Sequence, residues 1–339
     1  MPQQINAYAA MSPKGKLERY SYTPKPLGPD DVEIAVQYCG ICHSDLSLLN
    51  NDWGLTTYPF VPGHEVAGKI SAVGSNVVHR KVGDPVGLGW YSKSCMGCKQ
   101  CLTGNHNLCP TVEGTIIGRP GGFADRVRCH WSWATPLPGE LDSAKAGPLF
   151  CAGVTVFNPM VQFAVKPTDR VGVVGIGGLG HLALQFLNNW GCYVVAFSSS
   201  DSKRDEAMKL GATEVVNSKN ADAMKKLAKS LDFIISTVNV PLDWGTILDT
   251  LAPKGRLHLV GALAEPLPVN VFQLLTSQLS VSGSPLGSPA TTAQMLDFAA
   301  RHKIAPIIEE YPMSQINEAF ERLESGKARY RIVLKNDLV

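Results

Sequence analysis

Apolar and polar residues alternate in short runs through the first half of the chain. Val32–Tyr38 follows this period-two pattern, which predicts a strand with one buried face. Between Gly63 and Gly89, glycines separate further short apolar segments, as they do at the turns of β-rich folds. This half of the chain is therefore predicted to form a β-rich, partly barrel-like domain.

The pattern changes near residue 150, where short apolar runs begin to alternate with longer segments of helical periodicity. Such alternation predicts an α/β fold with a doubly wound parallel sheet. Beyond residue 288 we expect a helix and a last strand that return to the first domain, which makes the second domain an insertion. The predicted strands are Arg170–Val174, Tyr193–Phe197, Asp232–Ser236, Arg256–Val260 and Arg329–Leu334, and the predicted helices are Leu179–Trp190, Lys203–Leu210 and Ala290–His302.

Composition and charge narrow the class of protein. A chain of 339 residues with 45% hydrophobic and 18% charged residues is typical of a globular protein of two domains. The net charge of +2 gives no electrostatic reason to expect a nucleic acid or an anionic membrane as partner. No stretch reaches the roughly 18 apolar residues of a membrane span, and the first residues lack the apolar core of a secretory signal. We therefore expect a cytoplasmic protein, in which the nine cysteines indicate metal binding rather than disulfides.

Four of the cysteines are closely spaced in a loop rich in Gly, Asn and Ser. They follow the pattern C-x2-C-x2-C-x7-C and are Cys95, Cys98, Cys101 and Cys109. Two-residue gaps allow thiolates to converge on one ion, and four sulfurs complete the closed tetrahedral shell of a structural zinc. An iron–sulfur cluster is the main alternative, but the seven-residue gap does not fit the common ferredoxin spacing. The remaining alternative is that the four cysteines are free or buried and bind no metal.

A second set of metal donors is dispersed along the chain. Cys42 lies in CGICHSD, His64 in PGHEVAG and Cys151 in GPLFCAG. Two cysteines and one histidine would leave the fourth position open, as in a catalytic zinc site. Taken singly, each of these residues is more often a buried core residue, so spacing alone leaves both interpretations open.

A glycine-rich turn follows the apolar run VGVV and precedes a predicted helix. Its residues are Gly175, Gly177, Gly178, Leu179 and Gly180, within GIGGLG. Such a turn lets the backbone approach a pyrophosphate, and the helix N-terminus supplies N–H donors. The strand, turn and helix context favours a dinucleotide-binding site over a purely structural turn.

The end of the second predicted strand bears on which dinucleotide is bound. About 20 residues beyond the loop, an NAD enzyme usually carries Asp or Glu for the ribose hydroxyls. This chain has hydroxyls there, followed by two cations, in Ser198, Ser199, Ser200, Lys203 and Arg204. Hydroxyls and cations without a repelling carboxylate favour the 2′-phosphate of NADP(H). The alternative is a solvated serine turn.

Together these motifs resemble the zinc-containing medium-chain alcohol dehydrogenases, and most of all the branch of cinnamyl alcohol dehydrogenases and bacterial aldehyde reductases. The resemblance covers nearly the whole chain and includes the terminal GKARYR at 326–331. It implies a GroES-like catalytic domain at 1–152 and 289–339, with a Rossmann domain inserted at 153–288. It also implies two zinc ions per chain, one catalytic and one structural.

The resemblance assigns roles to particular residues. Cys42, His64 and Cys151 would hold the catalytic zinc, with Glu65 behind it as a transient ligand and Asp45 orienting His64. Further matches are Ser44, for the substrate oxygen and proton relay, and His43 with either Arg329 or Arg331, for the cofactor phosphates. Some relatives carry a relay histidine where this chain has Ser47, so the far end of the proton path stays open.

The expected reaction is hydride transfer between NADP(H) and a broad range of aldehydes and primary alcohols, aliphatic or aromatic. Trp53, Tyr58 and Trp90 are candidates for an apolar substrate wall, or equally for core packing. The resemblance also implies a homodimer through a sheet edge at Leu279–Ser284. Alternatives are a zinc-free reductase, an NAD-dependent polyol dehydrogenase and a non-enzymatic redox-sensing binding protein.

Overall fold

The chain divides into two units in the computed structural model, which describes residues 4–338. The first unit is Met1–Val154 with Gly287–Val339, and the second is Thr155–Leu286. Residues 1–3 and 339, which the sequence analysis assigned to the first domain, lie outside the described residues. Each unit has its own sheet and is described by itself.

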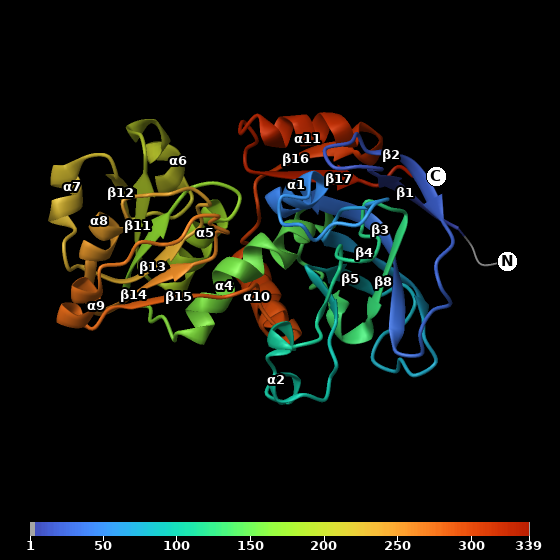
Figure 1. The fold of residues 1–339 in the computed structure, drawn as a ribbon. Coiled ribbons are helices and arrows are strands. Elements are labelled where there is room, and N and C mark those ends of the chain that lie inside the picture. The colour runs from blue at the N-terminus through green and yellow to red at the C-terminus, as the bar shows by residue number, and fades with distance from the viewer. Residues whose placement is uncertain (1–3, 339) are drawn as a thin grey trace. The chain divides into compact units, whose positions relative to one another are not determined.

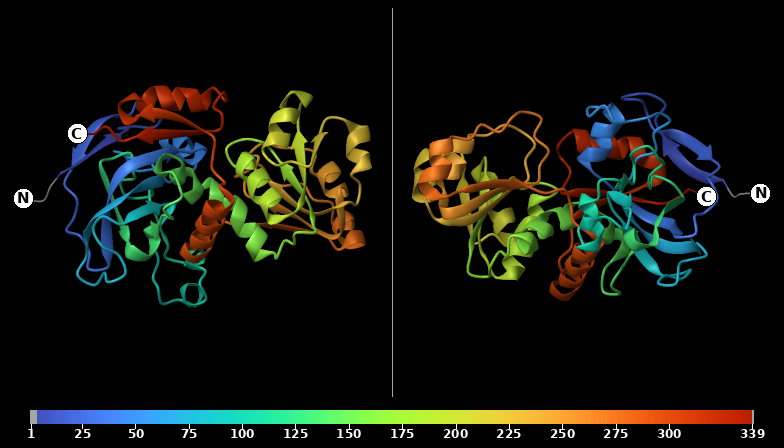
Figure 2. Two further views of the ribbon diagram at one scale, coloured as in Figure 1. Left: turned by 180° about the vertical axis from the view of Figure 1, so that it is seen from behind. Right: turned by 60° about the horizontal axis from the view of Figure 1, so that its bottom comes forward.

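The first unit is organised by the long strand β3 (Asp31–Ile41). Its inward side chains Val32, Ile34 and Val36 are buried, as the alternating pattern predicts. On one side β3 pairs antiparallel with β4 (Glu65–Val73), and on the other with β8 (Arg126–His130) and β17 (Arg331–Lys335). The C-terminal strand thus lies beside the N-terminal half of the chain, which the red and blue ribbons of Figure 2 make visible.

Other elements complete this unit around the seven-stranded sheet, whose strand order is β16-β17-β3-β4-β5-β9 with β8 on β3. The remaining strands are β1 (Ile5–Ala9), β2 (Glu18–Tyr22), β5 (Pro85–Leu88), β6 (Tyr91–Lys93), β7 (Glu113–Gly114), β9 (Thr135–Pro136) and β16 (Ile308–Pro312). The helices are α1 (His43–Asn50), α2 (Lys99–Leu102), α3 (Ser143–Ala146), α10 (Pro289–His302) and α11 (Ile316–Glu324), with α4 (Ala152–Gln162) crossing the boundary between the units.

The second unit is a six-stranded parallel sheet with the order β12-β11-β10-β13-β14-β15, visible beside α5 in Figure 1. Its strands are near-continuous apolar runs because both faces of a parallel sheet are covered. The strands are β10 (Arg170–Val174), β11 (Tyr193–Ser198), β12 (Glu214–Asn217), β13 (Leu231–Ser236), β14 (Leu251–Leu259) and β15 (Ser280–Gly283), and the helices are α5 (Gly180–Trp190), α6 (Arg204–Lys209), α7 (Ala221–Lys226), α8 (Trp244–Asp249) and α9 (Val271–Ser277).

Most predicted boundaries differ from the observed ones by one to five residues, and for three elements a local feature explains the difference. Strand β14 begins five residues before the predicted Arg256 and ends at Leu259, because Leu251 already pairs with Leu231 and the intervening Pro-Lys-Gly segment is an irregularity within the strand. Helix α6 is preceded by a 3₁₀ turn at Asp201–Lys203 and starts only at Arg204. The last strand starts at Arg331 because the amides of Tyr330 and Arg331 both donate to the carbonyl of Ile307.

None of the helices in residues 4–338 is both long and apolar enough to cross a membrane. The longest described helix, α10, has 14 residues. A membrane-spanning helix needs about 20.

Candidate metal centres and cofactor site

The dispersed donors meet at the end of strand β3. Cys42 follows this strand and forms the N-cap of α1, while Glu65 is the first residue of β4, which pairs with β3 so that Gly40 lies opposite Glu65. His64 directly precedes β4, and Cys151 follows the 3₁₀ turn Gly147–Phe150. Pairing of β3 with β4 brings Cys42 beside His64 and Glu65, and the 3₁₀ turn before Cys151 packs against both strands. Donors up to 109 residues apart in the chain meet in this way.

The donor atoms of Cys42, His64, Glu65 and Cys151 all lie within 4.8 Å of one another and are buried. The two sulfurs are 4.0 Å apart, and Cys151 Sγ lies 3.4 Å from His64 Nε2. Ligands bound tetrahedrally to one zinc stand about 3.8 Å apart for two sulfurs and about 3.6 Å apart for sulfur and nitrogen. The cluster thus has the spacing of a zinc site.

Asp45 fixes the orientation of His64. Its Oδ1 lies 3.0 Å from His64 Nδ1 and also accepts from the amide of Gly63 at 2.8 Å, while Oδ2 accepts from the amide of Cys42 at 2.9 Å. Burial opposes protonation of His64, but the neighbouring carboxylate outweighs it and raises the pKa of the imidazole. One carboxylate therefore holds two donors and turns Nε2 of the imidazole toward the cluster.

Glu65 is held behind the cluster by Arg331. The guanidinium of Arg331 contacts Glu65 Oε1 and donates to the carbonyl of Ile41 at 3.3 Å. The other oxygen, Glu65 Oε2, is fully buried without a hydrogen-bond partner, which an ion at the cluster would explain. A Cβ at Gly40 would overlap this oxygen, so only glycine leaves room for the carboxylate. Arg331 was predicted as one of two alternative phosphate contacts. Its side chain is instead 4% exposed and is engaged by Glu65 and the carbonyl of Ile41.

The predicted hydroxyl and two of the three predicted aromatic residues lie around the same cluster. Ser44 is half-buried, with Oγ 3.8 Å from Cys42 Sγ. The ring of Trp90 packs edge-on against His64 with centroids 4.8 Å apart, and Trp53 packs on Trp90 at 6.2 Å. Tyr58 is different, because its hydroxyl donates to the carbonyl of Leu49. His43 and Arg329 are exposed in this unit.

The four closely spaced cysteines form a second cluster, and their sulfurs also lie within 4.8 Å of one another. Cys101 Sγ is 3.9 Å from Cys95 Sγ and 3.6 Å from Cys98 Sγ, close to the separation expected around zinc. The amide of Cys98 donates to Cys95 Sγ at 3.3 Å, and that of Cys95 to Cys109 Sγ at 3.4 Å. Amides directed at sulfur stabilise thiolates. Within the described residues, none of the nine cysteines forms a disulfide.

The glycine-rich turn joins β10 to α5 as predicted. Gly175 has a φ of +89°, and Thr237 Oγ1 donates to its carbonyl at 2.9 Å. A Cβ at Gly180 would overlap that same carbonyl oxygen, whereas one at Gly177 would meet nothing within 4 Å. The close packing of helix on strand thus depends on Gly180, and the open side of the turn lies at Gly177.

A cavity of about 440 Å³ adjoins this turn within the second unit. Its lining combines hydroxyl-bearing and cationic side chains with apolar ones and one carboxylate, that of Asp243. Of the predicted cofactor residues, Gly175, Ser198, Ser199 and Lys203 line it. Arg204 lies outside its lining and donates to the carbonyl of Val215 at 3.0 Å. Ser200 also lies outside the lining and caps the serine turn, since its carbonyl accepts from Ser198 Oγ at 2.6 Å.

Part of this cavity was missed by the sequence analysis. The additional lining residues are Val174 of β10, Phe197 of β11, Ile176 of the glycine-rich turn, Ser218 and Lys219 after β12, Val238, Val240, Leu242 and Asp243 after β13, Met224 of α7, and Thr246 and Ile247 of α8. The apolar run after β13 was the available signal, because the carboxyl ends of parallel strands form the ligand crevice of such sheets.

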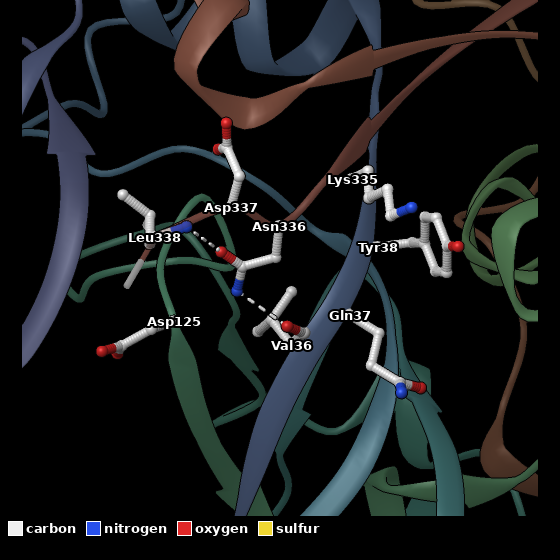
Figure 3. A pocket seen from close by; sticks show the side chains of 8 residues that line it. All are labelled: Val36, Gln37, Tyr38, Asp125, Lys335, Asn336, Asp337 and Leu338. Atoms are coloured by element: carbon white, nitrogen blue, oxygen red, sulfur yellow. Dashed lines mark hydrogen bonds between the residues drawn. The ribbon is translucent and has the colours of Figure 1, made fainter.

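Another hollow of about 440 Å³ lies in the first unit, between β3 and the C-terminal segment (Figure 3). Its central side chain, Asn336, donates to the carbonyl of Val36 at 2.7 Å and accepts from the amide of Leu338 at 2.9 Å. None of the metal donors lines this hollow. The asparagine serves to hold the C-terminal segment to the sheet.

The second unit has the doubly wound parallel sheet of nucleotide-binding domains, and the β-rich unit has a buried cluster of three or four metal donors. These two features together are typical of a metal-dependent dehydrogenase. Residues 28–139 match the alcohol dehydrogenase GroES-like domain, and residues 178–301 match the zinc-binding dehydrogenase domain. The chain belongs to the zinc-containing medium-chain alcohol dehydrogenases and is an oxidoreductase of aldehydes and alcohols. The family and fold class predicted from the motifs are confirmed.

Several relatives cover almost the whole chain. An aldehyde reductase of Synechocystis is 56% identical over 332 residues, 98% of this chain and 99% of the relative. An aldehyde reductase of Escherichia coli is 41% identical, covering 98% of each chain. A cinnamyl alcohol dehydrogenase from Sorghum bicolor superimposes with a TM-score of 0.94 at 40% identity, over 98% of both chains. The Helicobacter pylori enzyme, solved with NADP(H), gives 0.90 at 31% identity over 99% of both.

Proposed function

We propose that this enzyme is a zinc-dependent, NADP(H)-dependent aldehyde reductase that also oxidises primary alcohols. One observation carries the proposal: Cys42, His64 and Cys151 meet at tetrahedral zinc spacing in a buried cluster, with a half-buried hydroxyl beside it. Three protein ligands leave a fourth position for substrate. The family and its aldehyde-reducing relatives support the same reaction.

The residues of the cluster divide the work. Cys42, His64 and Cys151 hold the metal, Asp45 sets the tautomer of His64, and Glu65 supplies a carboxylate within ligand distance. When bound, zinc supplies a Lewis acid for the carbonyl and the nicotinamide supplies a hydride. Ser44 lies close enough to the cluster to hydrogen-bond the substrate oxygen and pass it a proton.

The four-cysteine cluster is proposed to hold the structural zinc. Cys95, Cys98, Cys101 and Cys109 offer four sulfurs and no open position, and amides directed at the sulfurs of Cys95 and Cys109 favour the charged form of these two. Burial and neighbouring thiols raise the pKa of Cys101 to about 11. A bound cation would remove that proton.

NADP(H) is proposed as the cofactor because the cavity lining offers Ser198, Ser199 and Lys203 at and just after the end of β11, and serines stand where an NAD enzyme usually carries its carboxylate. The Helicobacter pylori relative binds NADP(H). Gly175, Gly177, Gly178, Leu179 and Gly180 would bind the pyrophosphate, with His43 and Arg329 as further phosphate contacts. Ser200 and Arg204 are proposed to act more distantly, since both are hydrogen-bonded away from the cavity.

The substrates are proposed to be a broad range of aliphatic and aromatic aldehydes. Trp90 and Trp53 form a continuous aromatic surface beside His64, which favours apolar groups without selecting one shape. We further propose a cytoplasmic homodimer in which residues 1–152 and 289–339 form the catalytic domain and residues 153–288 the cofactor domain. The dimer would form through β15, the edge strand in Leu279–Ser284.

The first experiment compares initial rates of benzaldehyde reduction with NADPH and NADH, before and after a zinc chelator. We expect NADPH to be preferred and chelation to remove the activity. Equal or better use of NADH would refute the cofactor proposal and leave the zinc enzyme standing. Activity that survives complete removal of zinc would refute the metal assignment.

A matched pair of variants tests the catalytic ligands. Cys42 and Cys192 are both 6% exposed, but only Cys42 belongs to a donor cluster. Cys42→Ala should lose one of the two zinc ions and essentially all turnover. Cys192→Ala should keep both zinc ions and native turnover. Elemental analysis with activity assays reads out both effects. Near-native turnover and zinc content in Cys42→Ala would contradict the assignment.

A further inference from the structure

Lys219 lines the proposed cofactor cavity although it is 16 residues beyond Lys203 in the sequence. It follows β12, the edge strand next to β11. Asn217, the last residue of β12, pairs with Ser198, the last residue of β11. The amide and hydroxyl of Ser218 both donate to the carbonyl of Ser198, at 2.8 and 3.2 Å. The segment that carries Lys219 is thereby fastened to the serine turn at the end of β11.

The backbone around Lys219 is fixed by its neighbours. Its amide donates to Asn217 Oδ1 at 3.0 Å, and the side chain of Asn220 caps α7 by accepting from the amide of Ala223 at 3.0 Å. Two short-range caps therefore bracket the residue, so that its position relative to β11 is set by the fold. Its exposed side chain remains available to a ligand.

The charges of the cavity favour a group more negative than a ribose hydroxyl. Two lysines, Lys203 and Lys219, share the lining with the hydroxyl-bearing Ser198, Ser199 and Ser218. The cavity's acidic side chain, Asp243, accepts from the amide and hydroxyl of Thr246 at 3.1 and 2.6 Å, so its carboxylate is committed to the N-terminus of α8. A phosphate monoester carries a charge of about −1.5 to −2 at neutral pH, more than one ammonium neutralises.

We propose that Lys219, on the loop after β12, is a second cationic contact for the 2′-phosphate of NADP(H), and with Lys203 determines the choice of NADP(H) over NAD(H). Hydroxyls of Ser198, Ser199 and Ser218 would complete the anion site between the two ammonium groups. Apolar lining residues, which include Val238 and Ile247, would take the adenine ring. This inference rests on the proposed use of NADP(H) by the enzyme.

The test measures binding of 2′,5′-ADP and of 5′-AMP to the holoenzyme by calorimetry, so that it does not depend on turnover. Lys219→Gln should weaken 2′,5′-ADP binding about 5- to 10-fold and leave 5′-AMP binding unchanged. Lys203→Gln should behave in the same way. Lys225→Gln is the matched control, because it removes the same charge from exposed α7 outside the cavity; it should change neither affinity.

Each other outcome has a definite meaning. If Lys219→Gln binds 2′,5′-ADP like the wild type while Lys203→Gln does not, Lys219 is not a phosphate contact and the proposal is wrong. If Lys219→Gln weakens both ligands equally, the lysine contacts the part that they share, which also overturns the proposal. If the wild type does not distinguish the two ligands, the proposed NADP(H) preference itself fails.

Discussion

Asp45 shows how much of the metal site depends on one residue that is not a ligand. It is fully buried and bonds the backbone on either side of the site, at Cys42 and Gly63, as well as the imidazole of His64. A carboxylate can accept all three hydrogens, whereas an amide side chain has one accepting oxygen and an NH₂ group that must donate. The charge of Asp45 is therefore as necessary as its shape.

Asp45→Asn should consequently weaken the catalytic site without removing any donor. We expect zinc affinity or kcat/KM to fall about 10- to 100-fold, the usual effect of losing an outer partner of a metal-bound histidine. Elemental analysis and steady-state kinetics would measure both quantities. Asp52→Asn, at an exposed position just beyond α1, is the control and should leave both unchanged. Full zinc retention and native kcat/KM in Asp45→Asn would remove Asp45 from the site.

In the connection from β10 to α5, one glycine serves the packing of the helix and another serves the binding of the cofactor. Gly180 faces the carbonyl of Gly175 so closely that no side chain fits, whereas Gly177 faces open space. Gly180 allows the helix to pack on the strand. Gly177 leaves the backbone accessible to a pyrophosphate.

Replacing these two glycines should therefore affect stability differently, although both replacements should weaken cofactor binding. Gly180→Ala should reduce the free energy of unfolding by about 1–3 kcal/mol, as overpacking usually does, and reduce cofactor binding with it. Gly177→Ala should unfold like the wild type but bind NADPH more weakly, because its methyl group occupies the approach to the turn. Thermal unfolding and fluorescence titration distinguish the two. A destabilised Gly177→Ala or a native-like Gly180→Ala would contradict this division.

At the scale of the whole molecule, the second unit carries an apolar surface next to its sheet edge. Helix α9 exposes Val271, Phe272 and Leu275 at 63%, 76% and 67%, and it directly precedes the edge strand β15. Exposed apolar groups beside an unpaired edge are typical of a protein–protein interface. They support the proposed homodimer.

Light scattering after gel filtration would test this interface. The wild type should have twice the 36.5 kDa mass of the chain, and the double variant Phe272→Glu/Leu275→Glu should have the mass of a monomer. Val78→Glu introduces a charge at a 79% exposed position of the first unit and should stay dimeric. A double variant that remains dimeric would place the interface elsewhere.

Short-range patterns in the sequence were sufficient for the four-cysteine cluster and the glycine turn, because each lies within about fifteen consecutive residues. The fold class and the doubly wound sheet followed from the alternation of such local patterns along the chain. The boundaries of β14, α6 and β17 were not, since a strand irregularity, a 3₁₀ turn and two amides sharing one carbonyl leave no periodic signal.

Long-range contacts were decided only by the tertiary structure. Pairing of β3 with β4 places Gly40 under Glu65, and pairing of β17 with β3 brings Arg331 onto that carboxylate from 266 residues away. In the same way, pairing of β12 with β11 places Lys219 on the cavity that Lys203 lines. Local sequence fixes which groups are present, but strand register fixes which of them meet, because it depends on burial and hydrogen bonding summed over the whole sheet.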